Sequence, residues 1–158
     1  MDKKLWSEVR LVVTDFDGVW TDGKVRVHDD GSESVVCSRK DTLRLKELAS
    51  RGIKLIVITK ETNPIATQRC RKMGVECIQG CDDKLLELQR LLTREKVLPR
   101  EVAYVGDDIN DLTCLRHVGL PITVADGHEL CQDAASYVTT RRGGDHAMRE
   151  ILDVILGD

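Results

Sequence analysis

The chain alternates short apolar runs with longer segments in which apolar residues recur every three or four positions. Four of the runs are nearly continuous and rich in β-branched residues. They occupy residues 9–14, 54–59, 102–106 and 120–124. Such runs predict strands that are buried on both faces of a sheet. Two shorter strand candidates lie at residues 76–79 and 137–139.

The segments between these runs have the periodicity of amphipathic helices. They lie at residues 42–51, 63–73, 83–93, 108–118 and 145–156. Gly52 and Gly74 follow the first two segments, as glycine often does at the end of a helix. Strands that alternate with helices predict an α/β fold, a Rossmann-like, doubly wound parallel sheet with helices on both faces.

One segment departs from this alternation directly after the first strand. Residues 24–37 carry two extended stretches separated by Asp29-Asp30-Gly31, which predicts a β-hairpin where a helix would be expected. The chain has no internal repeat, low-complexity tract or interdomain linker, so we expect one domain over residues 1–158. A C-terminal tail and helix should occupy about residues 141–158.

Composition excludes few functions. Hydrophobic residues make up 41% of the chain and charged residues 32%, and the net charge of -3 gives no general attraction to nucleic acid or to an anionic membrane. No apolar run is long enough to span a bilayer and the N-terminus does not resemble a signal peptide, so we expect a cytoplasmic protein. The 6 cysteines form no Cys-x-x-Cys pair, which favours buried thiols over disulfides or zinc ligands.

Polar side chains gather at the carboxyl ends of the predicted strands, where open parallel sheets bind their ligands. Asp15 and Asp17 follow the first strand. The other members follow later strands or open a helix: Thr59, Lys84, Asp107, Asp108 and Asp111. Crowded carboxylates repel one another unless a cation joins them, and their hard oxygens suit Mg²⁺. We therefore expect a magnesium site that acts on a phosphorylated substrate.

These residue types also suggest a reaction. Asp15 could attack a phosphoryl group and form an aspartyl-phosphate, which divides hydrolysis into two steps. Asp17 could protonate the leaving alkoxide and later deprotonate water. Thr59 and Lys84 could stabilise the charge on the transferring oxygens.

The same residues, in this order, resemble the four motifs of the haloacid dehalogenase superfamily of phosphatases. The motifs read Asp15-Phe16-Asp17-Gly18-Val19, Thr59, Lys84 and Gly106-Asp107-Asp108-Ile109-Asn110-Asp111. The resemblance implies that Asp15 is the nucleophile and Asp17 the acid and base. It also implies that Asp15, Asp107 and the backbone carbonyl of Asp17 hold Mg²⁺, with Asp108 and Asp111 in support.

A narrower resemblance is to the capless subgroup that hydrolyses phosphates of eight- and nine-carbon 3-deoxy-ulosonic acids. It rests on Gly18-Val19-Trp20-Thr21-Asp22-Gly23, on Asp82-Asp83-Lys84-Leu85 and on the tail Gly143-Gly144-x-x-Ala147-x-Arg149-Glu150. The resemblance implies a role in the biosynthesis of sialic acids or of 3-deoxy-octulosonate, and no cap domain. It further implies a homotetramer whose hairpins pair, with each site covered by a neighbouring subunit and Arg149 among the substrate contacts.

The segment after Thr59 bears on the choice of substrate. Glu61, Arg69 and Lys72 are similar to residues of the 2-keto-3-deoxynononate 9-phosphate phosphatases. Arg69 and Lys72 share a helix face and could meet a sugar-acid carboxylate, while Glu61 could accept hydrogen bonds from sugar hydroxyls. We therefore favour the nine-carbon substrate over 3-deoxy-D-manno-octulosonate 8-phosphate.

Three positions depart from the family pattern. Lys60 replaces a glycine, Thr42 ends a Lys40-Asp41-Thr42 sequence where Arg-Asp-Gly is usual, and His146 replaces the third glycine of the tail. Lys60 leaves one other function open, a non-catalytic tetramerisation domain related to that of CMP-acylneuraminate synthetases. A third candidate is a phospho-acceptor signalling domain such as a receiver, because that fold also uses aspartates at strand ends together with Thr and Lys.

Overall fold

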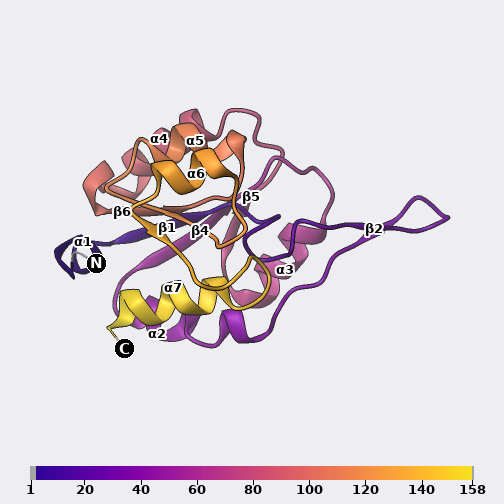
Figure 1. Ribbon diagram of the computed structural model, residues 1–158, viewed down its shortest axis with the longest axis horizontal. Coiled ribbons are helices and arrows are strands. Elements are labelled where there is room, and N and C mark those ends of the chain that lie inside the picture. The colour runs from indigo at the N-terminus through magenta and orange to yellow at the C-terminus, as the bar shows by residue number, and fades with distance from the viewer. Residues whose placement is uncertain (1–2, 158) are drawn as a thin grey trace.

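A computed structural model describes residues 3–157, which form a six-stranded parallel sheet with helices on both faces (Figure 1). The strands are β1 (Leu11–Thr14), β4 (Lys54–Ile58), β5 (Glu76–Ile78), β6 (Val102–Val105), β7 (Leu120–Thr123) and β8 (Tyr137–Val138). Their order is β5-β4-β1-β6-β7-β8. The doubly wound α/β fold is thereby confirmed, and each strand lies within two residues of its predicted bounds.

The helices form two layers that cover the two faces of the sheet (Figure 1). One layer contains α2 (Leu45–Ser50), α3 (Ile65–Met73) and α7 (Ala147–Leu156), and the other contains α4 (Lys84–Glu95), α5 (Leu112–Leu115) and α6 (Glu129–Ala134). Along β1, Val12 packs with the first layer, whereas Leu11 and Val13 pack with the second. This alternation explains why the strand is apolar at every position.

Two predicted helices are shorter in the structure. The segment at residues 42–51 contains the end of the 3-10 helix η1 (Lys40–Thr42) and then α2, and the segment at residues 108–118 becomes the 3-10 helix η3 (Ile109–Asp111) and α5. Three short helices were not predicted from the sequence: α1 (Lys3–Ser7), α6 and the 3-10 helix η2 (Pro99–Glu101). These elements have only one or two turns, too few for apolar residues to show a helical period.

The predicted hairpin projects from the body of the molecule (Figure 1). Its strands, β2 (Arg26–Val27) and β3 (Glu33–Ser34), pair antiparallel and are shorter than expected. Most of its side chains are exposed, including Val27 at 66%. Within the described residues, only this hairpin and η1 separate β1 from α2, so no cap domain is inserted there.

The expected domain over residues 1–158 includes positions 1, 2 and 158, which lie outside the described residues. In residues 3–157 we find no helix with the length and apolar character needed to cross a membrane. All six cysteines have free thiols, and Cys70, Cys114 and Cys131 are buried.

Candidate active site

Asp15 stands at the carboxyl end of β1, where the strand order of the sheet reverses. Its backbone N–H donates to the carbonyl of Val105 at 2.9 Å, which extends the pairing of β1 with β6 by one residue. The residue is 6% exposed, and its side-chain Oδ1 accepts from the N–H of Phe16 at 2.6 Å. The end of the sheet thus holds the carboxylate in one orientation, with Oδ2 turned to a cation.

That cation is Lys84, the first residue of α4. Its Nζ lies 2.8 Å from Asp15 Oδ2 and 2.8 Å from Asp111 Oδ1. The helix starts at this position because the Asp83 side chain caps it, accepting from the N–H of Leu86 at 2.9 Å. Lys84 is 4% exposed and therefore bridges two buried carboxylates.

Asp111 is fully buried, and both of its oxygens are occupied. Oδ1 accepts from Lys84 and from the Tyr104 hydroxyl at 2.7 Å. Oδ2 accepts from the N–H groups of Asp107 at 3.1 Å and Asp108 at 3.5 Å. Asp111 therefore organises the turn after β6 and ties it to Lys84. Tyr104 was not among the predicted site residues, although a tyrosine inside a buried strand needs a partner for its hydroxyl.

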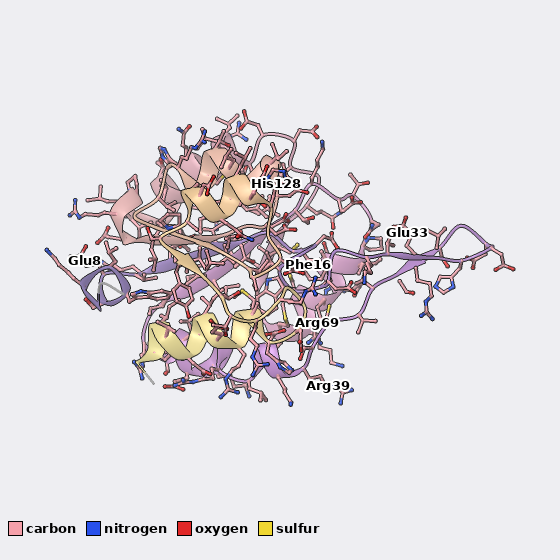
Figure 2. All side chains as sticks on the ribbon, viewed as in Figure 1. Glu8, Phe16, Glu33, Arg39, Arg69 and His128 are labelled. Atoms are coloured by element: carbon pink, nitrogen blue, oxygen red, sulfur yellow. The ribbon has the colours of Figure 1, made fainter. Side chains whose placement is uncertain are left out.

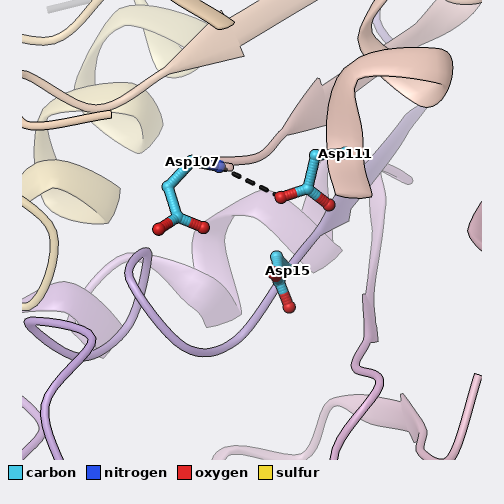
Figure 3. Close-up of side chains that lie close together, drawn as sticks. All are labelled: Asp15, Asp107 and Asp111. Atoms are coloured by element: carbon cyan, nitrogen blue, oxygen red, sulfur yellow. Dashed lines mark hydrogen bonds between the residues drawn. The ribbon is translucent and has the colours of Figure 1, made fainter. Parts of the chain in front are cut away.

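Asp107 completes a group of three carboxylates with Asp15 and Asp111. One oxygen from each lies within 4.8 Å of the others. Figure 3 shows Asp15 and Asp107 beyond two strand ends and Asp111 on the helical turn that follows Asp107. Gly18 lets the first loop approach this group, because a Cβ at Gly18 would lie 1.8 Å from Asp107 Oδ2. Its φ of +82° also favours glycine.

The crowding changes the protonation of these groups. Burial and the charge of Asp111 raise the pKa of Asp15 to about 8, although Lys84 acts against the rise. Burial, Asp111 and Asp108 raise the pKa of Asp107 to about 7. Burial disfavours the charged form of Lys84, but the attraction of Asp15 and Asp111 outweighs it, so the pKa of Lys84 is raised. With Lys84 as its cation, the group retains protons near neutral pH, and a divalent cation would displace them.

Asp17 is not a member of that group of three carboxylates. It lines a cavity of about 180 Å³ together with Phe16, Glu33 and Glu61, between the base of the hairpin and the start of α3. Figure 2 labels Phe16 in the body of the molecule and Glu33 on the hairpin. Burial and the charge of Glu61 raise the pKa of Asp17, which favours its protonated form. The loop that follows Asp15 therefore presents a proton donor, Asp17, to this cavity.

Thr59 follows β4, the strand beside β1. It is 1% exposed, and its N–H donates to the carbonyl of Ile78 at 2.9 Å. Its hydroxyl oxygen accepts from the N–H of Glu61 at 3.2 Å, which orients the hydroxyl and the Glu61 backbone together. Thr59 thus stands beyond the same edge of the sheet as Asp15, because Thr14 pairs with Val57.

The structure does not bring the remaining predicted contacts to the cavity. Arg69 is half-buried and donates to the Ser38 carbonyl at 3.4 Å, while its Nε has no hydrogen-bond partner among the described residues. Lys72, one turn later on α3, is exposed. Arg149 lies on α7, and its Nε donates to Asp153 Oδ1 at 2.8 Å in a separate surface hollow.

Comparison with known proteins follows from this geometry. A family model described as haloacid dehalogenase-like hydrolase matches residues 57–145. The 3-deoxy-D-manno-octulosonate 8-phosphate phosphatase of Yersinia pestis is 34% identical over 151 residues, which cover 95% of this chain and 81% of that protein. Its Salmonella typhi counterpart is 35% identical over the same length and covers 80% of that protein.

Solved structures agree with these relatives. A 3-deoxy-D-manno-octulosonate 8-phosphate phosphatase from Yersinia pestis has a TM-score of 0.94 and 34% identity, covering 98% of this chain and 84% of that chain. The phosphatase of the same name from Moraxella catarrhalis, solved with magnesium ion, phosphate ion and KDO, has a TM-score of 0.94 and 33% identity. Here the match covers 98% of this chain and 89% of that chain.

Proposed function

Because the chain belongs to the haloacid dehalogenase-like hydrolase family and is a phosphoric monoester hydrolase, we propose that its substrate is 3-deoxy-D-manno-octulosonate 8-phosphate. One observation carries the chemistry: a buried carboxylate, Asp15, is oriented at a strand end beside Lys84, with the cavity of Asp17 next to it. The substrate follows the names of the relatives, which cover nearly all of this chain.

The cofactor is Mg²⁺, and the donor set suits it. Carboxylate oxygens are its preferred protein ligands. We assign Asp15 and Asp107 as side-chain ligands, with the backbone carbonyl of Asp17. Asp111 supports them, because its oxygens are already occupied by Lys84, Tyr104 and backbone N–H groups. Bound Mg²⁺ supplies positive charge against the phosphoryl oxygens and removes the repulsion among the carboxylates.

In the first step an Asp15 oxygen forms a bond to phosphorus while the bond from phosphorus to the sugar oxygen breaks. Lys84 and the Thr59 hydroxyl stabilise the charge on the transferring oxygens. Asp17 gives its proton to the leaving alkoxide. The raised pKa of Asp17 supports this role, because a general acid must hold its proton at the working pH.

In the second step Asp17, now ionised, accepts a proton from water. The resulting hydroxide attacks the phosphorus of the aspartyl-phosphate, which releases inorganic phosphate and restores Asp15. Burial and the charge of Glu61 raise the pKa of Asp17, and a raised pKa also favours the proton uptake that this step requires.

The test is a comparison of substrates with Mg²⁺ present. We expect turnover of 3-deoxy-D-manno-octulosonate 8-phosphate with a kcat/KM at least tenfold above that of simple sugar phosphates. No turnover of any phosphorylated 3-deoxy-ulosonic acid would refute the proposal. Asp15→Asn serves as the control, since turnover that survives it does not use this nucleophile.

A second candidate is 2-keto-3-deoxynononate 9-phosphate, the substrate that the sequence analysis favoured. Glu61 supports it, because this residue lines the same cavity as Asp17 and its carboxylate could accept hydrogen bonds from the hydroxyls of a longer sugar. The relatives favour the eight-carbon compound, and the two kcat/KM values decide between the substrates. The assay also separates the enzyme from a tetramerisation domain or a receiver, neither of which releases phosphate from a sugar acid.

The assembly is a further part of the proposal. Val25, Val27 and Val36 on the hairpin are 48%, 66% and 80% exposed, and burying them would favour association of copies of this chain. We assign a homotetramer in which Arg149 serves a neighbouring site, while Gly143 and Gly144 of the tail stay packed against the Asp15 loop of their own chain. Light scattering tests it, and a monomeric mass would remove Arg149 from the substrate contacts. Cell fractionation would test the expected cytoplasmic location.

A further inference from the structure

The tail of the chain packs directly against the loop that follows Asp15. Gly143 is buried, and a Cβ there would lie 1.7 Å from the carbonyl oxygen of Gly18. The next residue, Gly144, donates its N–H to the carbonyl of Val19 at 3.0 Å. No side chain fits between the two segments, so the position of the tail limits where the loop can lie.

The loop itself presents its backbone to the metal site. The N–H of Gly18 donates to Thr21 Oγ1 at 3.2 Å, which fixes the peptide unit that contains the Asp17 carbonyl. On its other side, Gly18 touches the Asp107 carboxylate. A shift of Gly18 would therefore move both the Asp17 carbonyl and the space beside Asp107.

Asp126 holds the tail in place. Its Oδ1 accepts from the N–H of Gly143 at 2.9 Å, and its Oδ2 accepts from the side chain of Arg142 at 3.3 Å. Asp126 lies in the loop after β7, and His128 in the same loop contacts the backbone of Asp107. The N–H of His128 donates to the Asp107 carbonyl at 2.7 Å.

These contacts close a ring around the site, running from Gly18 to Asp107, then through His128 to Asp126, and through Gly143 back to Gly18. We propose that Asp126 is a positioning residue for the metal site: it holds Gly143 against Gly18 and so fixes the Asp15–Gly18 loop relative to Asp107. The proposal rests on the proposed function only in its choice of Asp15, Asp107 and the Asp17 carbonyl as ligands.

The mechanism is indirect, and Asp126 touches neither substrate nor metal. Without its carboxylate, the buried N–H of Gly143 has lost its acceptor, and the tail gains from moving toward water. Residues that orient metal ligands typically change metal affinity by about 10- to 100-fold when they are replaced. Asp126 acts one contact further away, so we expect the lower end of that range.

The test measures Mg²⁺ binding to the full chain by titration calorimetry, with thermal unfolding as a check of the fold. Asp126→Ala should raise the Kd for Mg²⁺ about tenfold. Asp126→Asn keeps an acceptor oxygen for Gly143 and should bind within twofold of wild type. Arg142→Ala is the matched control, because it removes the other partner of Asp126 and leaves the bond to Gly143.

A Kd for Asp126→Ala within twofold of wild type would overturn the proposal. An equal loss of affinity in Asp126→Asn would also overturn it, because the charge of Asp126 would then matter and its hydrogen bond to Gly143 would not. An equal loss in Arg142→Ala would overturn it too, because that variant keeps the hydrogen bond to Gly143. If Asp126→Ala does not fold, Asp126→Ser replaces it under the same criteria, because its shorter side chain does not reach Gly143. Binding is measured without substrate, so a wrong substrate would leave this result standing.

Discussion

Raising the pH should destabilise the metal-free protein, because Asp15 must then become charged in a buried position. The pKa of Asp15 is raised from 3.8 to about 8 in the folded chain. Between these values the folded state holds a proton that the unfolded state has lost, so the free energy of unfolding falls as the pH rises. This dependence is opposite to that of a carboxylate whose pKa is lowered by a salt bridge.

The size of the effect follows from the same value. Each pH unit over which one extra proton stays bound changes the free energy of unfolding by about 1.4 kcal/mol. From pH 6 to pH 8, Asp15 should therefore lower it by about 2 kcal/mol. Asp107, with its pKa raised to about 7, adds a loss of about 1 kcal/mol over the same interval. Mg²⁺ displaces these protons, so the loss should disappear when Mg²⁺ is bound.

The assay is urea unfolding at pH 6, 7 and 8, followed by circular dichroism in EDTA and in Mg²⁺. Asp15→Asn is the control, because the amide does not titrate. The comparison also cancels Cys77, whose pKa is lowered to about 7 by a hydrogen bond from Cys70. Equal pH dependence of wild type and Asp15→Asn in EDTA would refute the reasoning, as would wild-type stability that rises toward pH 8 more steeply than that of the variant.

Four further outcomes test the site. Asp15→Asn should lower kcat by at least about a thousandfold at saturating Mg²⁺, and a smaller loss would argue for another nucleophile. Lys84→Met should lower kcat by about 10²- to 10³-fold, measured in steady-state assays, with a loss below threefold counting against its role. Tyr104→Phe, which removes a hydrogen bond to Asp111, should weaken Mg²⁺ binding about tenfold by calorimetry, whereas unchanged affinity would make the hydroxyl purely structural. Glu61→Gln should lower the pKa of Asp17 and move the basic limb of the kcat–pH profile to lower pH. If the basic limb does not move, the charge of Glu61 does not control the protonation of Asp17 during catalysis.

The features that were predictable from sequence are those encoded locally. The apolar run of residues 102–106 predicts a buried strand, and Asp107 follows this strand directly. The position of Asp107 at the ligand-binding edge then follows from the rule that open parallel sheets bind ligands beyond the carboxyl ends of their strands. Asp15 and Thr59 were placed in the same way. Neighbouring strand ends then bring these residues together with no further information from the sequence.

The parts that escaped prediction depend on contacts between distant segments. Tyr104 reads as a core residue until the fold brings its hydroxyl to Asp111. Asp126 and Gly143 are 17 positions apart, and nothing in either segment reveals that one caps the other. The ion pair of Arg149 with Asp153 is local, but its separation from the cavity depends on how α7 packs.

The three departures from the family pattern have different structural costs. Lys60 is exposed, and neither Lys60 nor Thr42 is among the described non-glycine residues with positive φ, so a side chain at these two positions brings no backbone strain. His146, by contrast, has a φ of +73°, where glycine is favoured by about 1 kcal/mol. The N–H of Arg149, in the first turn of α7, donates to Oδ1 of the buried Asp41 at 2.9 Å. A hydrogen bond contributes about 1 kcal/mol, which is about as much as this strain costs. Asp41 therefore keeps the turn into α7 without the glycine, and the tail can still reach Gly18.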